Sequence, residues 1–365
     1  MVFNYYNTYY KQNSNVMNII ELIKPDDWHV HFREGQMLEK LVPETSKLFN
    51  RAIVMPNLQT PITNSKQALN YKKHILKFSK NNNFFEPLLT FYLNTKVSQK
   101  DLINAFKNKV IFAVKLYPAG ATTNSSKGVK KLSDIFNILE TMERFKIPLL
   151  IHGEVNDKNV DIFDREKKFI EHELPQIYKN FPTLKITLEH ITTRYAVNFI
   201  NETSNNIKAS ITPHHLILNR TNMLEHKIKP HYYCLPILKR EEDRKALLEA
   251  AYNKNQKFFM GTDSAPHDIK NKEHECGCAG IFNTICSIQI LAQFFDNNNK
   301  LDCLENFISK NGALHYEVSP NVQKITLQKQ KVPINFPNTL NIKNQKIKIF
   351  KPDFDVFWNI VNEKN

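Results

Sequence analysis

The 365-residue sequence lacks any uninterrupted run of about 18 apolar residues, the length that a membrane-spanning helix needs. Its first residues also lack the basic start and apolar stretch of a secretory signal. Cysteine is sparse and odd in number, with five residues, so a secreted disulfide framework is disfavoured. These absences exclude an obvious membrane or secreted class, and we expect the chain to work in the cytoplasm.

The sequence also lacks a dense block of one charge. Its formal net charge is +14, but the basic residues are scattered through Lys/Asn-rich stretches. A solvated basic surface is the favoured interpretation, and we expect no nucleic-acid partner. Hydrophobic residues make up 41% of the chain and charged residues 24%, which is typical of a globular protein with a sizeable core.

Short apolar runs alternate with helix-like segments along most of the chain. Eight runs are predicted as strands: Ile19–Ile23, Arg51–Met55, Pro87–Leu93, Val110–Leu116, Pro148–Ile151, Lys185–Leu188, Ile207–Ile211 and Lys257–Met260. Eight βα units predict a closed parallel (β/α)8 barrel, which takes about 250 residues or more and so fits one large domain. An open doubly wound sheet is disfavoured because the motif G-x-G-x-x-G is absent.

Three segments show the strongest helical signals. Apolar residues at Ile135, Ile138, Leu139 and Met142 form one stripe, with Ser133 placed as an N-cap. Residues 240–253 form a charged helical pattern, and the apolar run from 281 to 295 is predicted as a buried helix after the last strand.

The two ends of the chain differ from this pattern. Residues 1–18 are polar, without periodicity, and are predicted as an extension that precedes a barrel spanning residues 19–318. Residues 319–365 contain two short β-like segments, Val322–Leu327 and Ile342–Phe350, separated by Pro333 and Pro337. We interpret this last part as an appendage that packs on the barrel.

Histidines and charged residues stand at the ends of the predicted strands. His29 and His31 follow the first strand, and the two-residue period of extended backbone places both rings on one face. Alone, this pair is more often a set of capping or hydrogen-bonded histidines than a metal site. Four further strands end in a polar residue: Lys115, His152, His190 and Asp263. Because strand C-termini meet at one face of a barrel, a shared metal centre would satisfy all six.

Lys115 is the unusual member of this set, because an ammonium group beside divalent cations would be repelled. A lysine that has captured carbon dioxide is an anionic carbamate, whose two oxygens can bridge two metals. The alternative is an ion pair of the unmodified lysine with Asp263 or Glu154. The histidines and the aspartate at matching strand ends favour the carbamate bridge.

The remaining cysteine and histidine clusters give weaker signals. Cys276 and Cys278 resemble half of a zinc knuckle, but no second close pair completes it, so a packed loop is favoured. The other histidines near strand ends or in loops are not expected to bind metal. They are His214, His215, His226 and His231.

Nine ordered motifs resemble the dihydroorotases of the amidohydrolase superfamily, especially the shorter bacterial type, over roughly residues 22–320. The motifs are Pro25–Arg33, Arg51–Asn57, Lys115–Ser125, His152–Glu154, Glu189–Thr193, Ile211–Pro213, Tyr233–Arg240, Gly261–His267 and Cys276–Gly280. The resemblance implies a hydrolase with two zinc ions that interconverts N-carbamoyl-L-aspartate and (S)-dihydroorotate in pyrimidine biosynthesis, most often as a homodimer.

The resemblance also implies a role for individual residues. It places His29, His31 and Asp263 on one zinc and His152 and His190 on the other, with carboxylated Lys115 and a hydroxide between the two ions. Asp263 is then the general acid and base. Contacts to the substrate are implied for Arg33, Asn57 and His267 and for the backbones of Leu235 and Ala279, and a mobile loop for Thr122 and Thr123.

One position departs from the bacterial relatives, since Gly120 stands where they carry Asn, which predicts a looser loop. Two alternatives remain. Hydantoinases and allantoinases of the same superfamily catalyse related ring openings, but they usually have longer chains and need no pair like Arg33 and Asn57. A non-catalytic barrel would be expected to have lost some of the ligands, whereas all six positions are filled.

Overall fold

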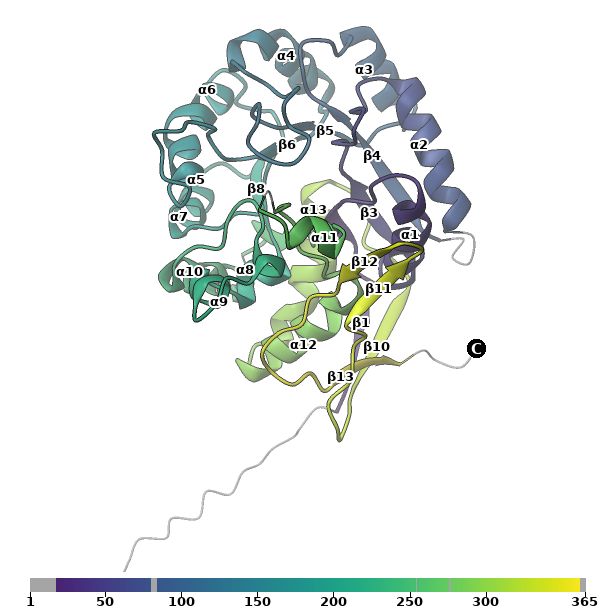
Figure 1. The fold of residues 1–365 in the computed structure, drawn as a ribbon. Helices are drawn as coiled ribbons and strands as arrows, with labels where there is room; N and C mark the ends of the chain where they lie inside the picture. The colour runs from purple at the N-terminus through teal and green to yellow at the C-terminus, as the bar shows by residue number, and fades with distance from the viewer. Residues whose placement is uncertain (1–17, 80–83, 254, 276, 362–365) are drawn as a thin grey trace, which may run out of the picture.

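The computed structural model describes residues 18–79, 84–253, 255–275 and 277–361. Eight parallel strands follow one another in sheet order from β2 to β9, as Figure 1 shows. They are β2 (Asp27–Val30), β3 (Arg51–Val54), β4 (Glu86–Tyr92), β5 (Ala113–Leu116), β6 (Leu149–His152), β7 (Ile186–Glu189), β8 (Ile207–Ile211) and β9 (Phe258–Met260). A parallel bridge between Val30 and Ser264 joins the two ends of the sheet. The predicted (β/α)8 barrel is therefore confirmed.

The prediction of the first barrel strand was wrong. Strand β1 (Ile19–Ile23) lies outside the barrel, in an antiparallel sheet with β10 (Lys324–Lys329) and β13 (Trp358–Val361). Its side chains alternate between exposed and buried, whereas the residues of β2 are all buried. Alternation is the signature of a strand with one solvated face, and a barrel strand is covered on both faces. His29 thus lies within the first barrel strand and not after it.

Helices surround the barrel on its outer face and at its two ends. They are α1 (Gln36–Leu48), α2 (Ser65–Phe78), α3 (Gln99–Lys107), α4 (Phe136–Phe145), α5 (Arg165–Lys168), α6 (Leu174–Tyr178), α7 (Arg194–Glu202), α8 (Pro213–Ile217), α9 (Arg220–Leu224), α10 (Glu241–Tyr252), α11 (Ile269–Lys272), α12 (Ser287–Asn297) and α13 (Asn311–His315). Short 3-10 or π segments supplement them at Leu132–Ile135, Phe169–Glu173, Pro230–Tyr232, Thr284–Cys286, Leu301–Cys303 and Asn306–Lys310. Within the described residues, no helix combines the length and the apolar character needed to cross a bilayer.

The three predicted helices are present, two of them with changed starts. The stripe from Ile135 to Met142 is buried, but Ser133 lies inside a 3-10 turn and α4 begins without a side-chain cap, so the predicted cap was wrong. Helix α10 has the predicted bounds, flanked by Arg240 and Asn253. The buried helix α12 begins at Ser287, later than predicted, because the residues from 281 to 283 extend the barrel edge through a bridge at Ile281.

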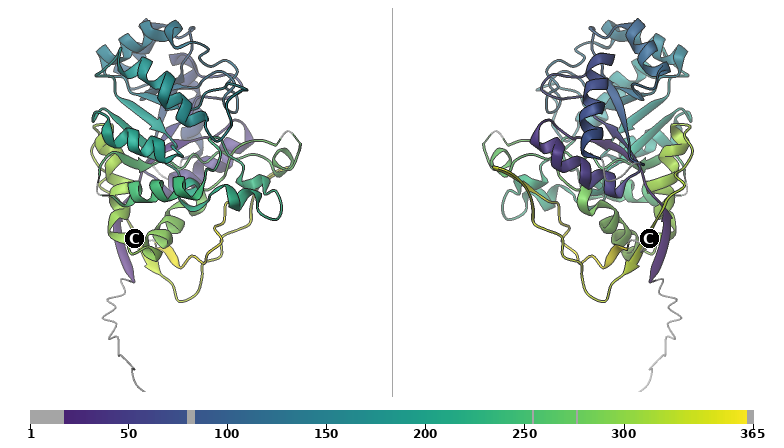
Figure 2. Two further views of the ribbon diagram at one scale, coloured as in Figure 1. Left: turned by 90° about the vertical axis from the view of Figure 1, so that its left-hand side faces the viewer. Right: turned by 90° about the vertical axis from the view of Figure 1, so that its right-hand side faces the viewer.

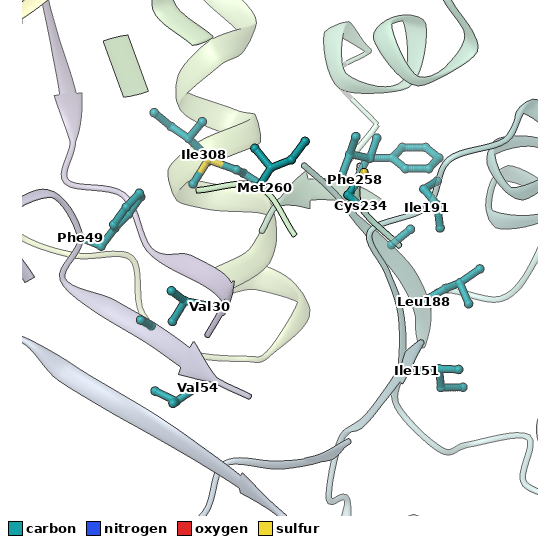
Figure 3. Packing of buried hydrophobic residues seen from close by; sticks show 14 of the residues in the cluster. Val30, Phe49, Val54, Ile151, Leu188, Ile191, Cys234, Phe258, Met260 and Ile308 are labelled. Atoms are coloured by element: carbon teal, nitrogen blue, oxygen red, sulfur yellow. The ribbon is translucent and has the colours of Figure 1, made fainter. Parts of the chain in front are cut away.

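Alternate residues of the barrel strands belong to two different hydrophobic clusters. One set points outward and packs against the helices, and Figure 3 shows Val54, Ile151, Leu188 and Met260 among them. The other set fills the barrel below its C-terminal rim. It includes Trp28, Ile53, Leu88, Ala113, Leu150 and Phe259. Two residues further along β4, β5 and β6, this inward face changes from apolar to polar, at Thr90, Lys115 and His152.

The C-terminal segment packs on the barrel from β1 to the rim. Besides β10 and β13 it forms the hairpin of β11 (Thr339–Ile342) and β12 (Gln345–Lys348). Figure 2 shows the yellow end of the chain beside the purple strand β1. Trp358 and Leu327 are fully buried in the same core as the barrel helices. Residues 1–17, most of the predicted N-terminal extension, lie outside the described part of the chain.

Candidate metal centre

The barrel strands direct a group of polar side chains into the top of the barrel. In β5 and β6, Ala113 and Leu150 fill the interior, and the next inward residues are Lys115 and His152. The same period brings Glu189 inward at the end of β7. All three side chains are almost completely buried. Polar groups so deep in a barrel require partners, because burying them alone is costly.

Three predicted ligands form a small triangle at the first strand. His29 Nε2 lies 3.3 Å from His31 Nε2, and each of these nitrogens lies 3.2 Å from Asp263 Oδ1. A zinc ion with bonds of about 2.0–2.1 Å in tetrahedral geometry separates neighbouring ligand atoms by about 3.3 Å. The three atoms therefore occupy positions that fit one face of a metal coordination shell.

A second pair of ligand atoms adjoins this triangle. His152 Nδ1 lies 3.3 Å from His190 Nε2, which again fits the edge of a coordination shell. The rings of His190 and His29 have their centroids 5.1 Å apart, so the two groups share one pocket. The structure thus brings the five predicted His and Asp ligands together, and Lys115 lies beside them, completely buried.

Glu189 is the partner of unmodified Lys115. Its Oε2 contacts Lys115 Nζ, and its Oε1 lies 3.0 Å from His29 Nδ1, an ion-pair contact without the direction of a hydrogen bond. The sequence analysis offered Asp263 or Glu154 as the partner of an unmodified lysine, and both assignments were wrong. Glu154 instead lies 3.0 Å from His152 Nε2. This contact fixes the ring so that Nδ1 faces His190.

The electrostatic environment prepares these groups to bind a cation. Burial lowers the pKa of His190 well below its usual value and that of His31 to about 4, so both rings are neutral. Burial opposes ionisation of Asp263, but His29 outweighs it and holds the pKa of that carboxyl well below its usual value. Neutral imidazoles and ionised carboxylates are the forms that bind metal. His29 is the exception, because its burial is outweighed by Glu189 and Asp263, which raise its pKa to about 9, so this ring must lose a proton when an ion binds.

The backbone at the rim is strained where it presents site residues. Arg33, His190 and Asp263 have φ of 59°, 42° and 43°, in the left-handed region that non-glycine residues rarely adopt. At His190 this turn follows directly after β7, which explains how two consecutive residues, Glu189 and His190, both reach the pocket. Strain of this kind persists only where the surrounding structure enforces it.

Buried Asp27 enforces the geometry between the first and last strands. It accepts hydrogen bonds from Thr262 N at 2.8 Å, from Thr262 Oγ1 at 2.6 Å and from His29 N at 3.2 Å. Asp263 N also donates to His29 O at 2.9 Å. These bonds join β2 to the segment after β9, so the predicted ligands His29 and Asp263 are held at a fixed separation.

The predicted substrate residues surround the same centre. A cavity of about 20 Å³ is lined by ligand residues together with Arg33, Asn57, Tyr117, Thr122, Thr123, Leu235, Ala265, Ala279 and Gly280. Of the predicted contacts, His267 lies just behind, with its Nε2 2.9 Å from Arg33 Nη2. The cavity holds little more than one water molecule, so the site is closed in this conformation.

A loop from Pro118 to Gly128 closes the cavity. Asn57 Nδ2 donates to Thr123 O at 2.9 Å, and Asn124 Nδ2 donates to Asn57 O at 3.0 Å. Gly120 has φ of 76°, and a Cβ there would lie 2.6 Å from Asn156 Nδ2. Glycine therefore suits the closed loop, which is held by internal hydrogen bonds such as Gly120 N to Ser125 O at 3.0 Å.

The other histidines and cysteines lie away from the cavity lining. His215 is occupied on both ring nitrogens, by Thr212 Oγ1 at 2.7 Å and Pro236 O at 2.9 Å, which suits a structural role. His214 is buried beside it, whereas His226 is exposed and His231 contacts Glu273. Cys278 is a partly buried free thiol, and Cys276 lies outside the described residues.

Sequence reasoning missed three residues that position the ligands. Glu189 appeared only as a letter in a motif, Asp27 was given no role, and Glu154 was offered for the wrong contact. A signal for Glu189 was present, because Ile186 and Leu188 are apolar while Thr187 and Glu189 alternate with them. Polar residues on the inward face of a barrel strand indicate a site rather than a core.

Comparisons with known proteins give a consistent result. A family model described as the amidohydrolase family matches residues 22–332. A dihydroorotase of Agrobacterium fabrum is 46% identical over 344 residues, which cover 94% of this chain and 100% of the relative.

Two solved structures are similar over almost the whole chain. The crystal structure of dihydroorotase from Campylobacter jejuni has a TM-score of 0.85 and 34% identity, and covers 98% of this chain and 100% of that one. The dihydroorotase of Saccharomyces cerevisiae in complex with 5-fluoroorotic acid has a TM-score of 0.85 and 33% identity, with coverage of 94% and 98%.

Proposed function

The chain belongs to the dihydroorotases of the amidohydrolase family, and from this premise we propose that its buried cluster is a two-metal centre for the interconversion of N-carbamoyl-L-aspartate and dihydroorotate. The single observation that carries the proposal is the set of ligand atoms separated by 3.2 to 3.3 Å. Such spacing fits the edges of a coordination shell, and the burial of these nitrogen and carboxylate atoms in one pocket supports a shared metal centre.

The proposed ligand sets follow the geometry. His29, His31 and Asp263 would hold one ion, and His152 and His190 the other. Lys115 would join the two ions as a carbamate, after giving up its contact with Glu189. Two divalent ions, zinc in the first place, would supply a hydroxide nucleophile near neutral pH and polarise the amide carbonyl under attack.

The proton transfer is assigned to Asp263. Its carboxylate lies between the two histidines of the first set and lines the cavity, so it can accept the proton of the nucleophile and deliver it to the leaving ring nitrogen. In the direction of ring closure the same carboxylate moves the proton the other way. The strained backbone at Asp263 and its hydrogen bond to His29 O keep it in place.

Substrate orientation is assigned to residues of the rim beside the proposed metal ligands. Arg33 offers a planar fork for a carboxylate, and its Nε donates to Pro266 O at 3.2 Å, which limits its motion. Asn57 and His267 complete this group, and the backbones of Leu235 and Ala279 face the ring. The loop with Thr122 and Thr123 excludes water once it has closed.

Two further features of the proposal rest on the family resemblance. We expect two copies of the chain to form a homodimer and the enzyme to act in the cytoplasm on its small-molecule substrate, as part of pyrimidine biosynthesis.

Kinetic comparison of ring substrates tests the proposed reaction. We expect the metal-loaded protein to hydrolyse dihydroorotate and to cyclise N-carbamoyl-aspartate, with hydantoins and allantoin turned over far more slowly because they lack the ring carboxylate for Arg33. Preferred turnover of a hydantoin, or none of dihydroorotate, would refute the proposal.

A further inference from the structure

A second cavity, of about 130 Å³, lies where the C-terminal segment meets the rim of the barrel. Its walls come from the residues around α11, the extended segment after it and β12 with the residues that follow. They are His231, Tyr232, His267, Lys272, Gly280, Ile281, Phe282, Ile347, Lys348, Ile349, Phe350 and Lys351. This cavity is separate from the metal centre, but His267 and Gly280 lie close to both.

The charge of this cavity is of one sign. Three lysines and two histidines are among its lining residues, and none of the lining residues is acidic. Within the described part of the chain, no carboxylate forms an ion pair with Lys272, Lys348 or Lys351. Two acidic side chains adjoin the lining residues: Glu273 contacts His231 at 2.8 Å, and Asp268 accepts a hydrogen bond from Lys346 N at 3.4 Å. The three lysines of the cavity therefore have no carboxylate as an ion-pair partner among the described residues.

Lys272 is the most informative of these groups because it is only 3% exposed. Its Nζ donates to Tyr233 O and to Gly280 O, each at 2.8 Å. An ammonium group has three donors, and among the described residues the third has no acceptor. Burial lowers its pKa to about 8, so the group is still largely charged at neutral pH. A buried charge of this kind calls for an anionic partner.

We propose that this cavity is a binding site for a small oxyanion, of which inorganic phosphate is the simplest form. The third donor of Lys272 and the side chains of Lys348 and Lys351 supply charge-assisted hydrogen bonds of the kind that phosphate oxygens accept. Its volume suits a tetrahedral anion, and the apolar side chains of Ile281, Phe282 and Ile349 limit competition by water.

An anion bound there would stabilise the substrate side of the rim. Lys272 connects Tyr233 to Gly280, and Gly280 N also donates to Tyr233 O at 2.9 Å. These two residues stand one or two positions from Leu235 and Ala279, the proposed backbone contacts of the substrate. The site thus lies where occupancy can alter substrate affinity without contact between the anion and the substrate.

Thermal unfolding in phosphate, compared with chloride at matched ionic strength, tests the site. Phosphate at saturation is expected to raise the Tm by about 2 °C, because a ligand of the native state alone stabilises that state. In the double variant Lys348→Ala with Lys351→Ala, the phosphate affinity should fall about tenfold, since two of the three lysine charges are lost. Lys272→Met should abolish the response, but the Lys348/Lys351 variant decides the test if Lys272→Met does not fold.

Two controls separate this site from the rest of the molecule. Lys66→Ala with Lys73→Ala removes two exposed lysines of α2 and should leave the affinity unchanged. Arg33→Ala should also retain the response, since Arg33 belongs to the substrate pocket. The proposal is overturned if phosphate raises the Tm no more than chloride does. It is also overturned if the Lys66/Lys73 and Lys348/Lys351 variants lose phosphate affinity equally, or if Arg33→Ala is the only variant that abolishes the Tm shift.

Discussion

At the residue scale, Glu189 balances the charges of unmodified Lys115 and His29 in the candidate metal centre. Its carboxylate contacts Lys115 and His29, and it is completely buried between them. Removal of one member of a buried ion pair leaves the other charge without compensation, which is costly in a low-dielectric interior. Glu189 therefore stabilises the protein in its metal-free state.

We expect Glu189→Gln to lower the free energy of unfolding of the metal-free protein by about 3 kcal/mol, because the ammonium of Lys115 loses its buried counter-ion. Urea unfolding of the chelator-treated protein measures this effect. Glu154→Gln is the matched control, since Glu154 is equally buried but contacts the ring of His152 and no lysine. Equal stability of the wild-type protein and the Glu189 variant would show that Glu189 is not the counter-ion.

At the element scale, the loop from Pro118 to Gly128 depends on one glycine. Gly120 adopts the left-handed region, and the space for a Cβ is taken by Asn156, which donates to Ala119 O at 2.8 Å. Although the departure from Asn at this position predicted a looser loop, the structure shows a loop held by several hydrogen bonds. A side chain at this position would disturb that closed arrangement.

Gly120→Ala is expected to destabilise the closed loop by about 1 kcal/mol, from the positive φ and the contact with Asn156. Steady-state kinetics should show a rise in KM of several fold, while the metal content stays unchanged. Asn156→Ala relieves the contact and should restore part of the affinity in the double variant. If KM is unchanged in Gly120→Ala, the loop does not depend on glycine for closure.

The sequence allowed most barrel strands to be predicted, because buried apolar runs such as those of β6 and β8 carry a strong signal. The first strand was misassigned for a physical reason. Strand β1 is apolar and alternating, while β2 reads Asp-Trp-His-Val, a polar segment that is buried only because its partners are supplied by Thr262 and the metal centre. The local sequence pattern of β2 does not reveal those partners, because they come from other parts of the chain.

The candidate site, like the fold, has one part that could be predicted from the sequence and another part that could not. Residues at the ends of strands could be predicted as ligands because barrel topology brings strand ends together. The contacts of Glu189 and Asp27 could not, since they depend on the left-handed turn at His190 and on pairing between the first and last strands. Such contacts arise from the tertiary structure, and their only trace in the sequence is a weak alternation of polar and apolar residues.

At the scale of the whole molecule, the C-terminal segment completes the core. Several of its side chains are almost fully buried: Leu327, Ile342, Ile347, Ile349, Phe350, Val356 and Trp358. They belong to the same hydrophobic cluster as the barrel helices, and β10 covers the edge of β1. The barrel and the appendage predicted from the sequence thus share one core.

Deletion of residues 319–365 should therefore prevent cooperative folding. Each fully buried large apolar side chain contributes about 1.5–3 kcal/mol, so these seven side chains together contribute as much as the 5–15 kcal/mol that typically stabilises a domain. Circular dichroism with thermal melting is expected to show no cooperative transition for the truncated chain. A sharp transition close to that of the full chain would mean that the barrel folds independently.

The central claim of the account is that one pocket holds two metal ions on two sets of ligands, and anomalous diffraction at the zinc edge from crystals of the zinc-loaded protein tests it most directly. The account predicts two peaks about 3.5–4 Å apart, one against His29, His31 and Asp263 and the other against His152 and His190, with continuous density for a carboxylated Lys115 between them. A single peak, or peaks at another cluster such as His214 and Cys234, would contradict it.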